Sequence, residues 1–245
     1  MTEPIVTSLP VRHGFFSRQG GVSEGPYASL NCSLSGQDRR DAVLENRARA
    51  ARSVGADPAR LVGLMQVHGT LVARVTVPWA PGEGPRADAM VTDRAGIALG
   101  IVTADCAPVL FVDAAAGVIG AAHAGWRGAV AGVLEATIAA MAALGARVER
   151  IAAAIGPCIG QPSYEVASDL HAAVADERFF VAGREGRWQF DLGGYCAARL
   201  RAAGIAGPSV VAADTAADEA RFFSHRRRTL AGGGPIGHQI SVVVQ

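Results

Sequence analysis

Cys106 and His123 are the residues best suited to do chemistry in this sequence, because each lies at the end of a short apolar run typical of a buried strand. His68 lies upstream, in the string LMQVHGT. One thiolate and two imidazoles form a ligand set that suits zinc, and catalytic zinc typically keeps three protein ligands and an open fourth position. The long separations between the three residues favour a site assembled by the fold over a compact structural zinc site.

The same residues have simpler interpretations. A buried cysteine is often only a small core residue, and a single histidine is often structural. Cys106 and His123 also fit a metal-free cysteine hydrolase, as nucleophile and base, although His68 would then have no role. A binding module without catalytic activity is a further alternative. Spacing alone does not decide between a metal site, structural residues, a cysteine hydrolase and a binding module.

The elements around these residues follow from the apolar periodicity. Strands are predicted at 97–102, 108–112 and 118–122, with turns between them, so that Cys106 and His123 come at strand ends. A helical pattern follows to Leu144, and Gly145 is a natural end. Free N–H groups at the start of that helix, together with Arg127, are expected to bind an anion of the substrate.

Asp105 directly precedes Cys106 and has two interpretations. Its carboxylate could act in catalysis, by taking a proton or holding a ligand beside the metal. It could equally bond the backbone of its own turn, as aspartates commonly do. Asp88 has a similar pair of interpretations, as an orienting carboxylate for a ligand histidine or, as we expect, as a turn residue.

Other elements are predicted along the rest of the chain. A loop at 18–31 is either an ordinary surface loop or a substrate-binding one, in which Arg18 and Asn31 supply donors. His68 is expected in a tight turn between two strands. The predicted strands are 10–17, 61–66, 71–77, 150–155, 187–190, 207–213 and 240–244, and the predicted helices are 41–55, 164–175 and 192–204. Such a mixture of strands and helices, without repeats or a linker, indicates a single α/β domain.

Composition excludes several function classes. The net charge is +1, which argues against binding to nucleic acid or to a membrane surface. All 23 basic side chains are arginines, so Schiff-base, pyridoxal-phosphate and P-loop lysine chemistry are excluded. No apolar run is long enough to span a membrane, and the N-terminus does not resemble a signal peptide. The four scattered cysteines are therefore expected as free thiols in a cytoplasmic protein.

Four strings occur in a fixed order: QVHG, TADCAPVLF, AAHAGWRG and AIGPCIG. They closely resemble the laccase-domain (YfiH-like) family, long labelled polyphenol oxidases and later recognised as purine nucleoside enzymes. FFSRQGGVSEGPYASLN, VLENRARA and FFSHRR extend the resemblance over nearly the whole chain. The resemblance implies one layered α/β/β/α sandwich domain with mixed sheets over residues 1–245. It also implies zinc ligands at His68, Cys106 and His123, and a catalytic or substrate-binding arginine at Arg47.

The implied activity is phosphorolysis of adenosine, inosine, guanosine and S-methyl-5'-thioadenosine to the free base and a ribose 1-phosphate, together with hydrolytic deamination of adenosine to inosine. Purine nucleosides and phosphate are thus the expected partners, and the oligomeric state is not predicted. The older interpretation, a copper polyphenol oxidase, needs a histidine-rich cluster, yet the chain has six histidines and no His-x-His pair. Copper binding in vitro is still expected from the Irving–Williams order.

Two positions depart from the family pattern. Relatives usually carry Cys-Thr where this chain has Asp214-Thr215, and tend to carry arginine where it has His238. Neither position is one of the expected metal ligands. The departures leave open the roles of the C-terminal segment and the substrate preference.

Overall fold

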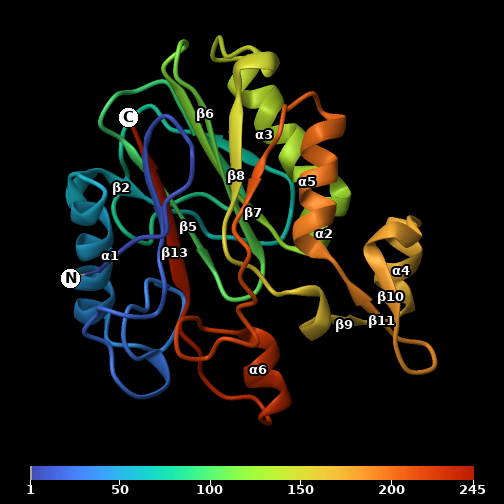
Figure 1. Ribbon diagram of the computed structural model, residues 1–245. Coiled ribbons are helices and arrows are strands. Elements are labelled where there is room, and N and C mark those ends of the chain that lie inside the picture. Colours follow the sequence, from blue (N-terminus) through green and yellow to red (C-terminus); the bar gives the residue numbers. More distant parts are fainter. Residues whose placement is uncertain (1) are drawn as a thin grey trace.

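The computed structural model describes residues 2–245 and contains two β-sheets packed face to face between helices (Figure 1). The smaller sheet has the order β1-β13-β5-β2. Its strands are β1 Arg12–Phe15, β13 Gln239–Val244, β5 Ala98–Thr103 and β2 Leu61–Val62. β13 is antiparallel to β1 and to β5, and β2 is parallel to β5. The sheet is therefore mixed and joins the two ends of the sequence.

The larger sheet has the order β12-β8-β6-β7-β4-β3. Its strands are β12 Ser209–Val210, β8 Ala152–Ile155, β6 Ala107–Asp113, β7 Val118–Ala124, β4 Ala89–Thr92 and β3 Val72–Arg74. The central strands are antiparallel, and the two outer strands, β12 and β3, are each parallel to their neighbour. β6 and β7 are buried along their full length, as expected of strands covered on both faces.

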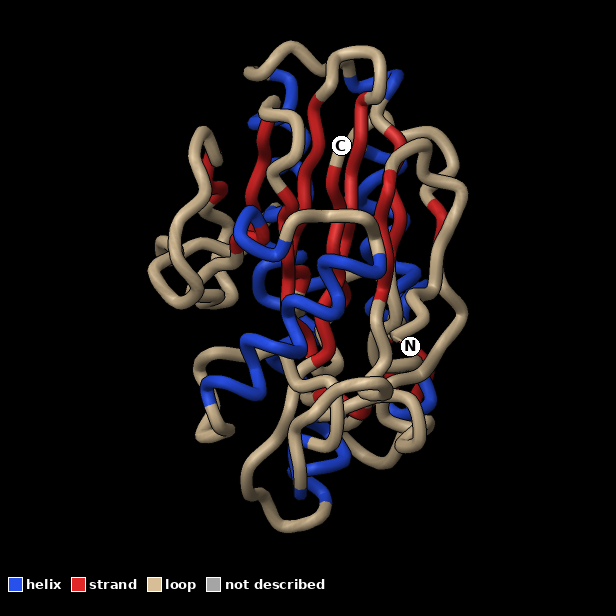
Figure 2. Tube along the Cα trace, turned by 90° about the vertical axis from the view of Figure 1, so that its left-hand side faces the viewer, coloured by secondary structure: helices blue, strands red, loops and turns tan. Residues whose placement is uncertain are grey.

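Helices cover the two outer faces. The helices are α1 Arg40–Ser53, α2 Trp126–Ala131, α3 Val133–Ala142, α4 Ser168–Val174, α5 Leu192–Ala202 and α6 His225–Leu230. α1 lies across the smaller sheet, in front of the strands in Figure 2. α3 and α5 cover the larger sheet (Figure 1). A separate apolar cluster that includes Phe15, Leu99 and Ile119 fills the space between the sheets. The layered α/β/β/α sandwich is thereby confirmed.

A small lobe projects from the side of the sandwich (Figure 1). It consists of α4 and a three-stranded sheet of order β10-β11-β9. These strands are β10 Phe180–Ala182, β11 Trp188–Phe190 and β9 Glu165–Val166. Short 3₁₀ turns occur at Gly25–Tyr27, Pro58–Arg60, Val148–Arg150, Gln161–Ser163 and Glu177–Phe179. Within residues 2–245, none of the helices has both the length and the apolar character that a membrane crossing requires.

Several elements differ from the sequence prediction: the strand predicted at 207–213 shortens to β12, α6 and β10 were not predicted, and three further differences have a clear local cause. The helix predicted to Leu144 is split in two by Gly132, whose φ of 102° is left-handed and ends α2 before α3 begins. The helix predicted at 164–175 begins as strand β9, because Val166 pairs with Trp188 across the lobe. The two strands predicted around His68 shorten to β2 and β3, so His68 lies in the loop between them and not at a strand end.

Candidate metal centre and its cavity

His68, Cys106 and His123 come together at one end of the larger sheet. One nitrogen or sulfur atom from each lies within 4.8 Å of the other two, and Cys106 Sγ is 3.9 Å from His68 Nε2. Among residues 2–245, this is the one group of three or more His, Cys, Asp or Glu side chains close enough to hold an ion. Tetrahedral zinc with nitrogen and sulfur ligands places those atoms about 3.5 Å apart. The observed separations are of that order, so the three residues fit a metal.

Two of the three ligands lie in or beside strained turns. His68 has a left-handed φ of 61°, and Asp105, directly before Cys106, has a φ of 91°. Non-glycine residues adopt this conformation at a cost of about 1–3 kcal/mol, and they do so mainly at functional sites. His123 instead lies inside β7, where it pairs with Pro108 of β6. The β6–β7 pairing therefore sets the distance between His123 and the turn that carries Cys106.

Asp88 holds two of the candidate ligands at once. Its Oδ1 accepts hydrogen bonds from His123 Nδ1 (2.9 Å) and from the backbone N–H of His68 (2.8 Å), and its Oδ2 accepts one from the backbone N–H of Gly69 (2.6 Å). It is thus placed as the orienting carboxylate considered from the sequence, and its remaining hydrogen bonds hold the turn of His68 and not a turn of its own. Because Nδ1 of His123 donates to Asp88, the Nε2 lone pair is directed toward the ligand cluster, an arrangement common at metal sites.

Gly125 and Gln66 supply the remaining support. A Cβ atom on Gly125 would lie 2.9 Å from His68 Cδ2 and 3.0 Å from Cys106 Sγ, so a side chain there would displace both ligands. The Gln66 amide donates to the Val102 carbonyl (2.8 Å) and accepts from the Val102 N–H (3.0 Å). This side chain extends the ladder at the edge of β5 and ties the loop of His68 to the smaller sheet.

The ligand cluster favours a charged sulfur. Burial alone would raise the pKa of the Cys106 thiol, but the neighbouring His123 and His68 outweigh it and lower that pKa to about 6. Burial alone would lower the pKa of His123, but Cys106 and Asp88 outweigh it and raise that pKa to about 9. A thiolate is the form in which cysteine binds metals or attacks a substrate.

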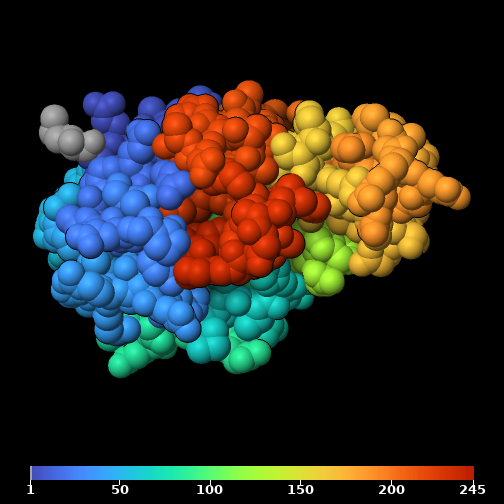
Figure 3. All heavy atoms as spheres, turned by 90° about the horizontal axis from the view of Figure 1, so that it is seen from below, coloured from blue at the N-terminus to red at the C-terminus, as the bar shows by residue number. Residues whose placement is uncertain are grey.

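The cluster opens into a cavity of about 710 Å³. Its walls come from both sheets, from α1 and α6, and from Tyr164, which directly precedes the small lobe. The segment that carries α6 lies between the N-terminal part of the chain and the lobe (Figure 3). Arg47 lines the cavity from α1; it is 6% exposed, and its Nη2 has no hydrogen-bond partner. A buried guanidinium with a free donor is a strong site for an anion.

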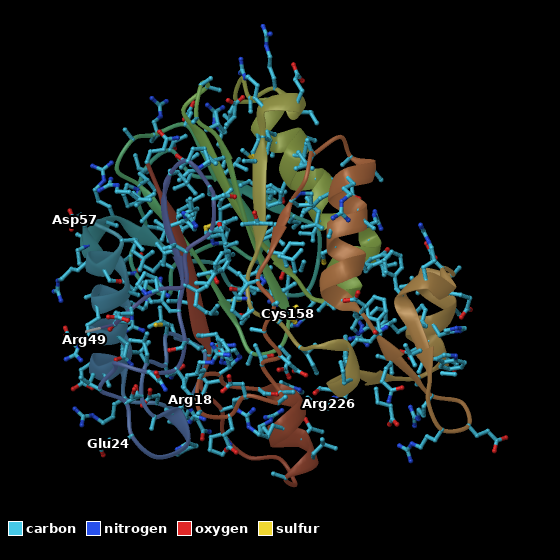
Figure 4. The ribbon with its side chains drawn as sticks, in the orientation of Figure 1. Arg18, Glu24, Arg49, Asp57, Cys158 and Arg226 are labelled. Atoms are coloured by element: carbon cyan, nitrogen blue, oxygen red, sulfur yellow. The ribbon has the colours of Figure 1, made fainter. Side chains whose placement is uncertain are left out.

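Asp105 also lines the cavity, but its carboxylate is already engaged. Oδ1 accepts from Thr215 Oγ1 (2.7 Å), and Oδ2 accepts from Ser224 Oγ (2.9 Å) and from the backbone N–H of Arg226 (2.6 Å). Figure 4 shows Arg226 at the start of α6. The carboxylate therefore ties the turn of Cys106 to α6. These partners are distant in sequence and do not belong to the turn of Asp105 itself.

Arg18, Asn31 and Arg127 are not among the residues that line this cavity. Arg18, labelled in Figure 4, donates to the Ala28 carbonyl, and its guanidinium lies over the Phe223 ring. The buried Asn31 amide bonds Asp38 and the backbone N–H of His238. Arg127 is exposed and lies over its neighbour Trp126. The structure thus brings together the three ligands, Arg47 and Asp105, and leaves the other three outside.

Sequence reasoning missed other residues of the cavity wall, namely Gln66, Thr103, Tyr164 and His238. Burial raises the pKa of Tyr164, and the nearby Cys106 adds to this effect, so its hydroxyl stays protonated. Gln66 is part of the QVHG string, so the resemblance did include it, but without a role. The pairing of β13 with β5 brings His238 to the cavity, and nothing local in the sequence signals it.

The sequence profile of a family described as multi-copper polyphenol oxidoreductase laccase matches residues 12–245. The chain belongs to this family. It is 45% identical to a purine nucleoside phosphorylase of Deinococcus radiodurans over 90% of this chain and 85% of that protein. It is 50% identical to a purine nucleoside phosphorylase of Streptomyces griseus over 71% of this chain and 70% of that protein.

Solved structures agree with this family membership. The crystal structure of the hypothetical protein YfiH of Bacillus licheniformis superposes with a TM-score of 0.89 and 30% identity, covering 95% of this chain and 91% of that one. The family expected from the sequence strings is therefore confirmed. The family description mentions several copper ions, whereas the part of the chain described by the structure brings one ligand cluster together.

Proposed function

We propose that this protein is a purine nucleoside phosphorylase that holds zinc at His68, Cys106 and His123. The observation that carries the proposal is one cavity that contains both the three converging ligands and the unpaired guanidinium of Arg47. The unpaired guanidinium suits the phosphate anion. The names of the relatives support the same activity. The cavity volume lies within the range usual for small-molecule sites.

In phosphorolysis, a phosphate oxygen bonds to the anomeric carbon of the ribose while the carbon–nitrogen bond to the base breaks. The bonding electrons move to the base, which takes up a proton. Arg47 is proposed to bind and orient the phosphate, since its fork matches an oxyanion. When bound, zinc would supply Lewis-acid chemistry and lower the pKa of a coordinated water.

The proposal also includes the substrates and residue roles that the resemblance to the laccase-domain family implies. The substrates are adenosine, inosine, guanosine and S-methyl-5'-thioadenosine, and hydrolytic deamination of adenosine is a second activity. Asp105 is proposed to position the turn of Cys106, because all its hydrogen bonds go to the protein. Asn31 supports the site through the backbone of His238, and Arg18 and Arg127 remain predicted substrate-binding residues. A cytoplasmic location remains a prediction of the sequence.

One observation favours a second candidate, the metal-free cysteine hydrolase. Cys106, His123 and Asp88 form a chain of nucleophile, base and orienting carboxylate, and the Cys106 thiol has a low pKa. His68 counts against it, since a hydrolase of this kind needs no second histidine beside the sulfur. Copper-dependent oxidation of polyphenols has less support, because it needs a second, histidine-rich cluster.

The decisive experiment compares wild type with Cys106→Ala. Bound metal is measured by elemental analysis, and adenosine is incubated with and without phosphate while chromatography resolves the products. We expect about one zinc ion per chain and phosphate-dependent adenine, with both lost in the variant. Phosphate-independent inosine would establish the deaminase activity. Phosphate-dependent turnover that survives complete chelation would refute the zinc assignment. Metal-free wild-type protein without nucleoside turnover would overturn the proposal in favour of the hydrolase.

A further inference from the structure

Three buried polar atoms without a hydrogen-bond partner belong to residues that line the cavity: Arg47 Nη2, Thr103 Oγ1 and His238 Nδ1. An unpaired buried polar group costs about 1–3 kcal/mol, so native proteins rarely leave one without a reason. Three such atoms from three separate elements are explained most simply by a polar ligand that bonds them. The hydrogen bonds around these three residues indicate which of the unpaired atoms would bind the same group of such a ligand.

Arg47 and His238 are held together through one short segment. Arg47 Nη1 donates to the carbonyl oxygen of Cys32 (3.2 Å), and the N–H of Cys32 donates to the carbonyl oxygen of His238 (3.0 Å). The N–H of His238 in turn donates to Asn31 Oδ1 (2.9 Å). The backbone of His238 is thus fixed on both sides, and its ring lines the same cavity as the guanidinium.

Within residues 2–245, neither side chain of this pair is hydrogen-bonded to a carboxylate. The hydrogen bond of Arg47 goes to a backbone carbonyl and not to a carboxylate, and burial lowers the pKa of Arg47. His225, another histidine on the cavity wall, already contacts Arg228 at 2.7 Å through Nε2. Besides the hydroxyl of Thr103, the unpaired buried polar atoms of the described cavity wall therefore belong to Arg47 and His238.

We propose that His238 and Arg47 together form the subsite for inorganic phosphate. This inference rests on the proposed function and adds His238 to Arg47 as a second residue that binds the phosphate. Burial, helped by His123, His225 and Arg228, lowers the pKa of His238 to about 4, so its ring is neutral near pH 7. A neutral imidazole offers one N–H donor and one acceptor nitrogen. Hydrogen phosphate has oxygens that accept and a P–OH that donates, so it can satisfy a guanidinium and a neutral imidazole together.

The test is steady-state kinetics of the zinc-loaded enzyme, varying phosphate and nucleoside separately, for His238→Ala and His238→Gln. We expect His238→Ala to raise the KM for phosphate on the order of 10- to 100-fold, as for a lost hydrogen bond to a charged partner. The KM for nucleoside should change by less than about twofold. Glutamine retains a donor and an acceptor and should recover part of the loss. His171→Ala is the matched control, because that ring stacks on Trp188 in the small lobe.

Two failures are distinguishable. Wild type without phosphate-dependent turnover would refute the proposed function itself. Wild type with such turnover, but with a phosphate KM that His238→Ala leaves unchanged, would refute the subsite alone. Equal increases in both KM values would also refute it, since they would indicate a general distortion of the cavity. Thermal unfolding and zinc content, measured on every variant, separate misfolding from loss of the subsite.

Discussion

Asp88→Asn tests whether one buried carboxylate holds two metal ligands in place. Asp88 is fully buried and accepts hydrogen bonds from the His123 ring and from the backbone N–H groups of His68 and Gly69. Asparagine keeps one oxygen, so its NH₂ group must face at least one of these donors. The loss of one hydrogen bond to a charged acceptor is expected to lower the free energy of unfolding by about 1.5–3 kcal/mol. Zinc affinity should fall about 10- to 100-fold, because the orienting partner of His123 is weakened.

Zinc affinity is measured by competition with a chromophoric chelator, and stability by urea unfolding of metal-free protein. Asp113→Asn is the control. That carboxylate is equally buried and accepts from Arg150 and from the backbone N–H of Arg147, but it lies at the far end of β6 from Cys106. The Asp113→Asn variant should lose a similar amount of unfolding free energy while its zinc affinity stays unchanged. The reasoning is refuted if Asp88→Asn binds zinc within about threefold of wild type while remaining folded.

Two further predictions concern packing and pH. Gly125→Ala should lower zinc affinity at least about tenfold, because its Cβ would lie 2.9 Å from His68 Cδ2 and metal ligands tolerate shifts of only about 0.5 Å. Gly36→Ala, whose Cβ would lie 3.7 Å from the nearest atom, is the control in the same chelator competition, and equal affinities would contradict the prediction. Burial alone would raise the pKa of Asp113, but hydrogen bonds from Arg150 and the backbone hold it below its usual value. Asp113 therefore stabilises the fold above its unfolded pKa of about 3.9, and this contribution is lost as pH falls through the lower folded pKa. The stability gap between wild type and Asp113→Asn, from urea unfolding across pH, should narrow below about pH 4, and a constant gap would exclude this contribution.

Local patterns predicted much of the scaffold. Helix α1 and strands β5 to β8 occur close to where apolar periodicity placed them, because their burial follows from short-range sequence. The break at Gly132 and the strand at Val166 were not predictable in this way. The first depends on one left-handed glycine inside a helical pattern, and the second on a partner strand beyond the local window.

The residues of the candidate site also fall into those that local sequence predicted and those that it did not. The three candidate ligands were singled out by residue type beside predicted strands, although His68 lies in a loop. The layering and Arg47 came from resemblance alone. The double role of Asp88 and the presence of His238 depend on contacts between segments far apart in sequence. No local pattern encodes such contacts, so they become visible only when the sheets are assembled.

The position of β13 between β1 and β5 also has a consequence for synthesis on the ribosome. Strands β4, β6, β7 and β8 are close in sequence and can pair early, whereas the smaller sheet cannot close until residue 244 has emerged. The three candidate metal ligands emerge with the early strands, and α6 and His238 emerge late. We therefore expect nascent chains to acquire zinc before the cavity has its final wall. Zinc content of chains stalled before residue 225 would test this order, and zinc-free stalled chains would contradict it.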